Sequence, residues 1–460
     1  MHINPNIFKA YDIRGVYDED FDNDLAYKLG VAFAGMRRIE MNIEVGDALP
    51  QIVVCTDMRV SSPELKKSLI DGLVDGGVDV VDIGLASTPT FYFAVAHYNY
   101  SGGIMVSASH NPAKYNGFKL VRERATPVSG ETGIMDLRDQ ILSDEIEVVS
   151  SKGVVSQKEN ILDEQVKYDL AYGDVSKIKP FKIVIDSSNA MGALYCDGLF
   201  KYLPQCKVER MFWELDGTFP NHEADPYKAE NIKYLEDKVK EVGADLGIAI
   251  DGDGDRIFFV DNLGDAIEPG IIRAILSRIF LRDKPGAKIC YDIRPGRITR
   301  DIIEENGGVP VVTRVGHSLI KEQAIREGAY FAGESSGHFF LNMGSEGCYE
   351  IPMIVILKIL EELSVSNQTF AEYIVPLKKY IHSGEINSIV SDQDAKIIEL
   401  KAIYSDGKQN DLDGITIEFE KYWFNVRKSN TESLLRLNLE ASNKVVMEEK
   451  RDEILAIINS

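Results

Sequence analysis

Two patterns of apolar positions alternate along the first part of the chain: short apolar runs typical of buried strands, and the spacing typical of helices. Three apolar runs predict buried strands, at Gln51–Thr56, Val78–Ile83 and Gly103–Val106. Between the first two, Ser62 is expected as a helix N-cap with Pro63 at the first helical position. Leucines follow at helical spacing, at Leu65, Leu69 and Leu73, and Gly76 and Gly77 are expected to end the helix. Strand, helix and strand in this order predict a parallel sheet.

The same alternation is repeated twice further along the chain. Its apolar runs predict strands at Phe181–Ile185, Ala244–Ile250, Ala287–Tyr291 and Val309–Thr313. Helical spacing is found in the stretch with Ile232, Leu235, Val239 and Val242, in a helix near Ile271, and from Ser318 to Glu327. Three α/β units of similar size suggest an internal structural repeat. In each unit the end of a strand carries an acidic residue: Asp57, Asp186 and Asp292.

The pattern changes from about Gln368 onward. Period-2 runs at Ile415–Phe419 and Leu434–Leu439 precede a closing helix near Lys444–Ile458, which predicts an α+β unit. The expected fold is therefore three mixed α/β sheet domains plus a smaller α+β C-terminal domain around a central cleft. The expected domain limits are residues 1–154, 155–260, 261–367 and 368–460, which agrees with the length, since 460 residues are too many for one core.

Charge and composition narrow the classes of partner. The chain has 51 Lys and Arg against 73 Asp and Glu, a formal net charge of −22. This charge repels nucleic-acid backbones and anionic membrane surfaces, so neither is expected as a partner. A small anionic substrate remains compatible, because a local cluster of cations can reverse the field within one cleft.

Cysteine usage and apolar runs indicate a cytoplasmic protein. The five cysteines are scattered and show no C-x-x-C spacing, so they are expected as reduced thiols: Cys55, Cys196, Cys206, Cys290 and Cys348. The N-terminal residues contain no apolar signal-peptide core. The most apolar later run, Ile351–Leu360, is short and contains Lys358, so no membrane span is expected. Nothing in the sequence determines the oligomeric state.

The segment Asp251-Gly-Asp253-Gly-Asp255-Arg256 directly follows a predicted buried strand. Three carboxylates this close need a cation, and the glycines allow the backbone to bend so that the side chains converge. Hard oxygen ligands with room for a phosphate oxygen favour Mg²⁺. A calcium loop of the EF-hand type would need Gly at its sixth position and Glu at its twelfth, where this chain has Arg256 and Asn262. A solvated Asp-Gly surface turn is the simplest alternative.

A second polar segment, Ser107-Ala-Ser109-His110-Asn111-Pro112, follows another predicted strand. Ligands bind at the carboxyl ends of parallel strands, and a serine there is a candidate nucleophile. Lys114, Asn116 and Lys119 follow closely. Ser, Asn and Pro are also ordinary turn residues, so this segment alone would not indicate catalysis.

Two later loops carry groups suited to sugars and anions. Gly333-Glu334-Ser335-Ser336-Gly337-His338 offers a carboxylate and hydroxyls, which match the donors and acceptors of sugar hydroxyl groups. Arg427-Lys-Ser429-Asn430-Thr431 offers a guanidinium, hydroxyls and loop N–H groups, the components of an anion site. Alone, the first segment is equally a polar glycine-rich loop and the second a hairpin turn.

Together, these four motifs in this order resemble the α-D-phosphohexomutase superfamily over essentially the whole chain. The start, Phe8-Lys-Ala-Tyr11-Asp-Ile-Arg14-Gly15, resembles the opening signature of its phosphomannomutase/phosphoglucomutase branch. Asp216-Gly-Thr-Phe-Pro-Asn-His222 resembles a further family segment, and the loop containing His317 another. The resemblance implies three α/β domains plus a smaller fourth domain around one cleft.

The resemblance also implies a reaction. Ser109 would carry the phosphoryl group and join the three aspartates as a ligand of Mg²⁺, while a hexose monophosphate is converted through a hexose 1,6-bisphosphate. Arg14, His110, Lys119, Arg256 and His338 are candidates for proton transfer or charge stabilisation. Substrate contacts are expected from Tyr11, His317, Glu334, Ser336, Arg427, Ser429, Asn430 and Thr431.

Two departures from the family pattern affect the turn of the phosphate loop and the sugar loop, and the second leaves the sugar open. Ser433 follows Thr431-Glu432 where the family usually has a proline, and the sugar loop has Ser335 where the mannose/glucose branch has methionine. Alternatives within the family are a phosphoglucosamine mutase and a glucose-only phosphoglucomutase. Alternatives from other classes are a Mg²⁺-dependent sugar phosphatase and a non-catalytic sugar-phosphate-binding protein.

Overall fold

The computed structural model describes residues 3–44, 46–294, 296–428 and 434–460. The chain divides into two compact units. The first consists of residues 1–267 and 336–373, and the second of residues 268–335 and 374–460.

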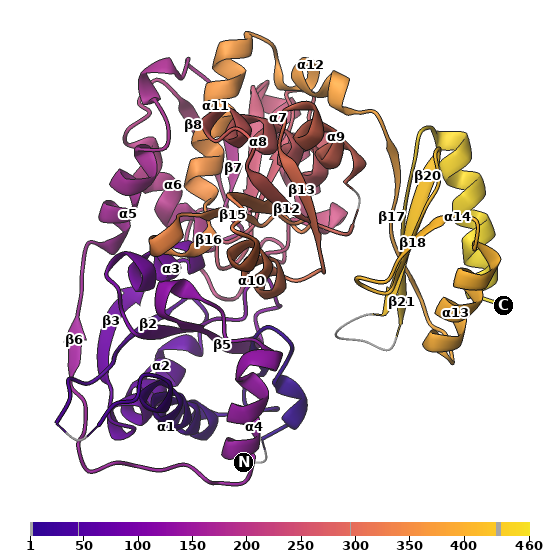
Figure 1. Cartoon of the computed structure of the whole chain (residues 1–460). Helices are drawn as coiled ribbons and strands as arrows, with labels where there is room; N and C mark the ends of the chain where they lie inside the picture. Colours follow the sequence, from indigo (N-terminus) through magenta and orange to yellow (C-terminus); the bar gives the residue numbers. More distant parts are fainter. Residues whose placement is uncertain (1–2, 45, 295, 429–433) are drawn as a thin grey trace. The chain divides into compact units, whose positions relative to one another are not determined.

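The first unit begins with a six-stranded mixed sheet. Its strands, in spatial order, are β1 (Ile13–Val16), β5 (Tyr115–Arg122), β4 (Gly102–Val106), β2 (Gln51–Thr56), β3 (Asp79–Leu85) and β6 (Val155–Gln157). The pairs β2–β3, β2–β4 and β3–β6 are parallel, whereas β5 is antiparallel to both of its neighbours. The helices of this part are α1 (Asn23–Glu40), α2 (Ser62–Asp75), α3 (Thr88–His97) and α4 (Ile134–Leu142) (Figure 1). The three predicted strands and the helix ending before Gly76 are confirmed, but β1 and β5 were not predicted.

One sequence prediction in this sheet is wrong. Ser62 is the first residue of α2 and Ser61 is its N-cap, so Pro63 stands at the second helical position. The reason is that the Ser62 side chain has another partner, since its Oγ donates to Oδ1 of Asp57 at 2.8 Å. The Asp57 carboxylate therefore ties the start of α2 to the end of β2.

Helices α1 and α2 pack closely because each has a glycine at the crossing. A Cβ on Gly72 would lie 2.1 Å from the carbonyl oxygen of Tyr27, and a Cβ on Gly30 would lie 2.5 Å from that of Leu69. The same helices bury apolar side chains against the sheet, including Leu25, Leu29, Phe33, Leu65, Leu69 and Leu73. This core supports the sheet from which the serine loop, Ser107–Pro112, leads after β4.

A second mixed sheet of five strands follows in the same unit. In spatial order it contains β11 (Ala266–Ile267), β10 (Ile257–Val260), β9 (Leu246–Ile250), β7 (Lys182–Asp186) and β8 (Lys207–Met211). Its helices are α5 (Ile161–Leu170), α6 (Gly192–Phe200) and α7 (Ala229–Val242). The unit also contains the antiparallel pair β15 (Phe339–Asn342) and β16 (Cys348–Glu350), and helix α11 (Pro352–Ser366). The apolar run noted above, Ile351–Leu360, lies largely within α11 and is buried against α5 and α6.

The second unit combines a parallel sheet with an antiparallel one. The parallel strands, in order, are β13 (Val309–Thr313), β12 (Lys288–Asp292) and β14 (Phe331–Gly333), with helices α8 (Pro269–Asp283), α9 (Arg297–Glu305) and α10 (His317–Glu327). The antiparallel strands, in order, are β17 (Ile381–Ser388), β21 (Leu435–Ala441), β20 (Tyr422–Lys428), β19 (Ile415–Glu418) and β18 (Lys408–Asn410). Helices α13 (Gln393–Ile403) and α14 (Lys444–Ile458) accompany this sheet, and the short α12 (Phe370–Ile374), which lies almost entirely in the first unit, precedes β17. The prediction of three α/β domains followed by an α+β domain is confirmed.

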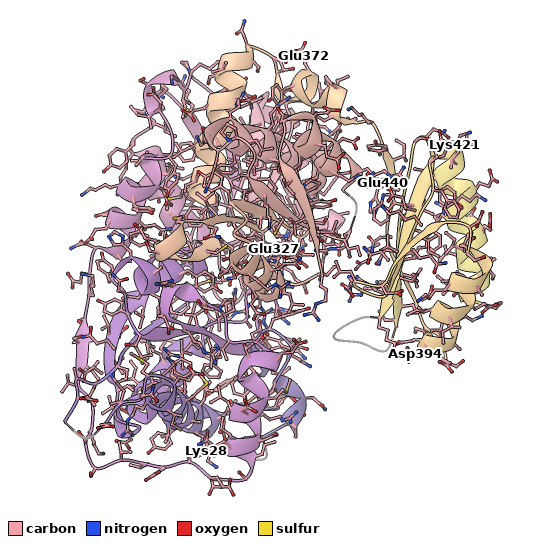
Figure 2. All side chains as sticks on the ribbon, in the orientation of Figure 1. Lys28, Glu327, Glu372, Asp394, Lys421 and Glu440 are labelled. Atoms are coloured by element: carbon pink, nitrogen blue, oxygen red, sulfur yellow. The ribbon has the colours of Figure 1, made fainter. Side chains whose placement is uncertain are left out.

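Within the second unit, Glu440 joins the antiparallel sheet to α9. Its Oε2 accepts hydrogen bonds from Nε1 of Trp423 at 2.6 Å and from the backbone N–H of Arg297 at 3.2 Å. Figure 2 labels Glu440 among the side chains. Burial raises the pKa of this carboxyl group.

All five cysteines are buried and free, as predicted. In the described parts of the chain, no helix combines the length and the apolar character needed to cross a membrane.

Candidate active site

Ser109 lies in the loop that follows β4, with a backbone conformation unusual for a serine. Its φ of 50° is in the left-handed region, and the residue is 1% exposed. The Ser109 N–H donates to Oγ of Ser107 at 3.0 Å, which helps to hold this turn. Ser107 thus shapes the loop, whereas Ser109 presents its hydroxyl to the neighbouring carboxylates.

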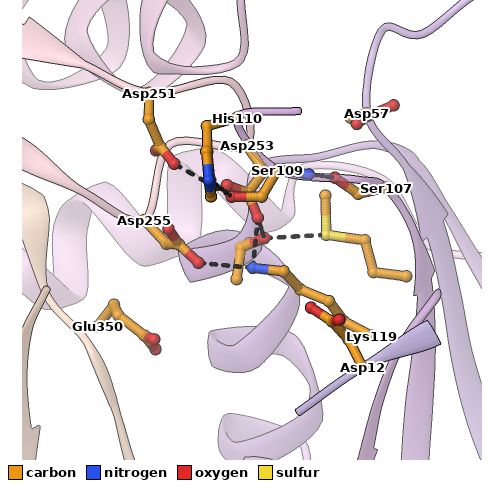
Figure 3. Close-up of polar contacts among 12 residues, drawn as sticks. Asp12, Asp57, Ser107, Ser109, His110, Lys119, Asp251, Asp253, Asp255 and Glu350 are labelled. Carbon is orange, nitrogen blue, oxygen red and sulfur yellow. Dashed lines mark hydrogen bonds and ion pairs between the residues drawn. The ribbon is translucent and has the colours of Figure 1, made fainter. Parts of the chain in front are cut away.

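The three aspartates follow β9 and converge as predicted. Their carboxylate oxygens lie within 4.8 Å of one another, and all three residues are buried. Oγ of Ser109 donates to Oδ2 of Asp251 at 3.2 Å, a contact between positions 142 residues apart (Figure 3). The predicted nucleophile and metal loop therefore form one site within the first unit.

Lys119 lies on β5 and neutralises part of this cluster. Its Nζ is 2.5 Å from Oδ2 of Asp253 and 2.6 Å from Oδ2 of Asp255 (Figure 3). Thr88, at the start of α3, also donates from its Oγ1 to Oδ2 of Asp253 at 2.6 Å. Burial alone would lower the pKa of Lys119, but the two carboxylates outweigh it and hold that pKa well above its usual range.

The remaining charge of the cluster suits a divalent cation. Burial, together with repulsion from Asp253 and Asp255, raises the pKa of Asp251 well above its usual range. Burial acts in the same direction on Asp253, but Lys119 and Thr88 hold its pKa well below the usual range. Oδ1 of Asp253 and Oδ1 of Asp255 are buried and have no hydrogen-bond partner among the described residues. Unpaired carboxylate oxygens in a buried, acidic cluster are the ligands that Mg²⁺ prefers.

Two of the candidate catalytic residues contact the serine loop. Nη1 of Arg14, on β1, donates to Oδ1 of Asn111 at 2.9 Å. Nδ1 of His110 lies 3.3 Å from Oγ of Ser109. Burial and the nearby cations Arg256 and Arg14 lower the pKa of His110 well below its usual range, so the ring is neutral near pH 7.

Arg256 and His338 form a second pair beside the aspartates. Nε of Arg256 donates to Nε2 of His338 at 3.1 Å, which places the ring proton on Nδ1. Nδ1 lies 3.6 Å from Oδ1 of Asp255 and 3.6 Å from Oε1 of Glu350. Glu350 was not predicted. A charged residue inside the apolar segment Tyr349–Pro352 was the available signal.

Ser336 and Tyr11 complete the predicted residues of the first unit. Ser336 is half-buried, and its buried Oγ has no hydrogen-bond partner among the described residues. Tyr11 is half-buried and lies two residues before β1. A hydroxyl that is left without a protein partner is well suited to a ligand hydroxyl.

In the second unit, Glu334 is held by two donors. Its Oε1 accepts from the backbone N–H of Gly316 at 2.9 Å and from Nη2 of Arg294 at 3.0 Å. His317, the next predicted residue, begins α10 directly after Gly316. Arg294 was missed, although it follows Asp292 in an Asp-x-Arg pattern that also occurs at Asp57.

Arg427 lies on β20 and is almost fully buried. Its Nη2 pairs with Oε2 of Glu385 at 2.9 Å, and Glu385 also accepts from Nη1 of Arg436 at 3.1 Å. Glu385 was not predicted, because its partner lies on another strand of the sheet. The other predicted members of this loop, Ser429, Asn430 and Thr431, lie outside the described residues.

A serine hydroxyl beside a buried carboxylate cluster, on a fold of three α/β domains and one α+β domain, suits an enzyme that transfers a phosphoryl group. Four family profiles match the chain: phosphoglucomutase/phosphomannomutase alpha/beta/alpha domain I at residues 5–145, domain II at 162–264, domain III at 268–380, and the C-terminal domain at 385–457.

The chain is also similar over most of its length to individual members of this family. A phosphomannomutase of Vibrio cholerae is 38% identical over 463 residues, covering 98% of each chain. A phosphomannomutase/phosphoglucomutase of Pseudomonas syringae is 36% identical over 452 residues, covering 96% of this chain and 92% of the relative. A crystal structure of a family member from Burkholderia thailandensis superposes with a TM-score of 0.87 at 32% identity, covering 99% of this chain and 97% of the other. The chain belongs to the phosphoglucomutase/phosphomannomutase family of α-D-phosphohexomutases.

Proposed function

We propose that this protein interconverts the 1-phosphate and 6-phosphate of mannose, glucose or both, with Ser109 as the phosphoryl carrier. The observation that carries the proposal is the hydrogen bond from Oγ of Ser109 to Asp251 within the buried aspartate cluster. Membership of the family makes the chain a phosphohexomutase, an isomerase of carbohydrate metabolism. The sugar and the residue roles belong to the proposal.

The cofactor in this proposal is Mg²⁺, held by Asp251, Asp253, Asp255 and the phosphorylated Ser109. When bound, the ion would neutralise negative charge on the transferring phosphoryl group. The buried oxygens of Asp253 and Asp255 that lack partners support this assignment. Lys119 already supplies one positive charge to the same carboxylates, and its raised pKa supports a role as a permanent cation rather than a base.

The reaction would take place in two transfers. In the first, the bond from phosphorus to Oγ of Ser109 breaks while a bond from phosphorus to the free sugar hydroxyl forms, which gives a hexose 1,6-bisphosphate. The hydroxyl proton passes to a neighbouring base, and the neutral ring of His110 is the candidate. Nε2 of His338 already accepts a hydrogen bond from Arg256, so His338 is assigned to stabilising charge at the reacting end. The bisphosphate then reverses its orientation and returns its other phosphoryl group to Ser109.

Substrate binding is assigned to both units. Glu334 and Ser336 would bind sugar hydroxyls common to both orientations of the hexose, with His317 and Tyr11 as further contacts. Arg427, Ser429, Asn430 and Thr431 would bind the phosphate that does not react. Arg14 and Arg256 would stabilise charge at the reacting end. Since one site must accept either end of the substrate, positioning and electrostatics would supply most of the rate.

In this proposal the four domains span residues 1–154, 155–260, 261–367 and 368–460. The proposal also places the enzyme in the cytoplasm, which the five buried, free thiols support. A hexose monophosphate is its only proposed partner; neither nucleic acid nor membrane is expected at a net charge of −22.

The test is a comparison of mannose 1-phosphate, glucose 1-phosphate and glucosamine 1-phosphate as substrates. Each is incubated with Mg²⁺ and a trace of glucose 1,6-bisphosphate, with and without EDTA, and the 6-phosphate product is measured. We expect metal-dependent conversion of the mannose and glucose compounds. Conversion of glucose alone or of glucosamine phosphate alone would reassign the sugar. Release of inorganic phosphate without isomerisation would identify a phosphatase, and no reaction at all would indicate a binding protein.

A further inference from the structure

Arg59 has a fully buried side chain and lies two residues after Asp57 at the end of β2. A guanidinium has five N–H donors, and all five are used here. Nε donates to Oδ2 of Asp57 at 3.2 Å. The other four donate to backbone carbonyl oxygens, three of them in the serine loop and one at the start of β5: Ser109 at 2.7 Å, Asn111 at 2.6 Å, Pro112 at 2.9 Å and Tyr115 at 2.9 Å.

The conformation of Ser109 explains why such a clamp is needed. A left-handed φ strains a residue that has a side chain, so the loop relaxes unless the surrounding structure holds it. Nη2 of Arg59 binds the carbonyl oxygens of Ser109 and Asn111, on either side of His110. The guanidinium therefore fixes the segment in which Ser109 is held in its strained conformation.

The segment Asp216–His222, which has no role in the proposed reaction, covers this clamp. The ring of Phe219 lies over the Arg59 guanidinium, with 5.2 Å from Cζ to the ring centroid. A Cβ on Gly217 would lie 2.7 Å from Cα of Arg59, so only glycine allows this approach. A segment of the second sheet domain thus presses on the residue that holds the serine loop of the first.

We infer that Arg59 is a positioning residue for phosphoryl transfer: it holds the backbone of Ser109 at the distance from the aspartates that transfer requires. This inference rests on the proposed function, because it assigns Arg59 a part in the reaction of Ser109. Arg59 bonds to no reacting atom and acts only through the loop.

The test compares Arg59→Lys and Arg59→Met with wild type. Lysine keeps the positive charge beside Asp57 but carries its three donors on a single atom, so it cannot bridge four carbonyl groups. A nucleophile displaced by about 1 Å costs about 100-fold in rate, so we expect kcat to fall about 100-fold in both variants. KM for hexose 1-phosphate should stay within about twofold of wild type, because binding of the non-reacting phosphate is assigned elsewhere. Single-turnover transfer from labelled glucose 1,6-bisphosphate to Ser109 should slow by the same factor as kcat.

Arg37→Met is the matched control. Arg37 is buried in the same domain, its Nε donates to the carbonyl oxygen of Ser101 at 3.0 Å before β4 begins, and it pairs with Glu40 and Glu123. Its loss should lower the melting temperature without changing kcat. The concentration of folded enzyme used to calculate kcat is the amount of Ser109 that can be labelled.

If Arg59→Met does not fold, Arg59→Lys alone tests the positioning role of Arg59. The inference is overturned if Arg59→Lys keeps kcat within about threefold of wild type, or if Arg37→Met loses as much kcat as the Arg59 variants. A wild-type enzyme that isomerises no sugar phosphate would instead reject the proposed function, and this inference with it.

Discussion

A Cβ on Gly252 would lie 2.4 Å from the carbonyl oxygen of Ser109. The aspartate loop, Asp251–Arg256, and the serine loop are thus in backbone contact at this point, and Gly252 also donates from its N–H to the carbonyl oxygen of Ala224 at 3.2 Å. Glycine is required here for close approach, which is how Asp251 reaches the Ser109 hydroxyl.

Replacing Gly252 with alanine should therefore separate the two loops. Overpacking of this kind costs about 1–3 kcal/mol of unfolding free energy. A displaced nucleophile should also lower kcat by about 100-fold. Urea unfolding and steady-state kinetics measure the two effects.

Gly35→Ala is the control for this substitution. Gly35 lies within α1, and its added Cβ would meet nothing within 4 Å. Alanine in a helix is favoured over glycine by about 1 kcal/mol, so this variant should be slightly stabilised and fully active. Normal kcat in Gly252→Ala would show that the loops tolerate separation.

Ser109→Ala should abolish covalent labelling of the protein by radioactive glucose 1,6-bisphosphate. It should also lower kcat at least about 1,000-fold, because Ser109 is the proposed phosphoryl carrier. Ser107→Ala should still be labelled, since Ser107 Oγ only accepts the hydrogen bond from the Ser109 N–H. The measurements are labelling stoichiometry and isomerase turnover. If Ser109→Ala is still labelled, or if Ser107→Ala is not, Ser109 is not the phosphoryl carrier.

Lys119→Met should destabilise the metal-free protein by about 3–5 kcal/mol, because it leaves two buried carboxylates without their cation. Added MgCl2 should then raise the melting temperature of the variant more than that of wild type, since the ion replaces the lost positive charge. Thermal unfolding with and without MgCl2 measures this difference.

Lys66→Met is the matched control. Lys66 pairs with Asp82 at 2.9 Å and is partly exposed, so its loss should cost only about 0–1 kcal/mol and leave the effect of Mg²⁺ unchanged. Equal shifts with Mg²⁺ in wild type and Lys119→Met would contradict the assignment of the aspartates as metal ligands.

His222 should make stability depend on pH. Burial would lower its pKa, but the contacts of Nε2 with Oδ2 of Asp186 at 3.0 Å and of Nδ1 with the carbonyl oxygen of Glu223 at 2.8 Å raise it above 6.5 overall. A histidine whose pKa is higher in the folded than in the unfolded state stabilises the fold. This stabilisation is fully present below the pKa of the unfolded state and is lost as pH rises through the pKa of the folded state. Wild type should therefore exceed His222→Gln in unfolding free energy by more at about pH 5.5 than at about pH 8.5. Equal differences at the two pH values would contradict a charged His222.

Several features of the fold were readable from local pattern. Strands such as Gln51–Thr56 and Val309–Thr313 and the helix Lys444–Ile458 were predicted at the limits that the structure has. Their apolar spacing reports the burial of each element, which is a local property of the chain. Strands β1 and β5 were not predicted, because apolar and polar residues alternate less clearly along them and because they contribute polar groups such as Arg14 and Lys119 to the site.

The sequence alone shows which groups are available: a serine and three alternating aspartates at the ends of buried strands, and an order of motifs that defines the family. Tertiary packing alone pairs Lys119 with Asp253 and Asp255 and binds Ser62 to Asp57 instead of making it the cap of α2. It also directs four of the five Arg59 donors to backbone carbonyl oxygens of the serine loop and of β5. These contacts join separate elements, as does the hydrogen bond between Ser109 and Asp251, which are 142 positions apart. Periodicity and turn residues encode which face of an element is buried, whereas the partner of a buried polar group is set by how the elements pack.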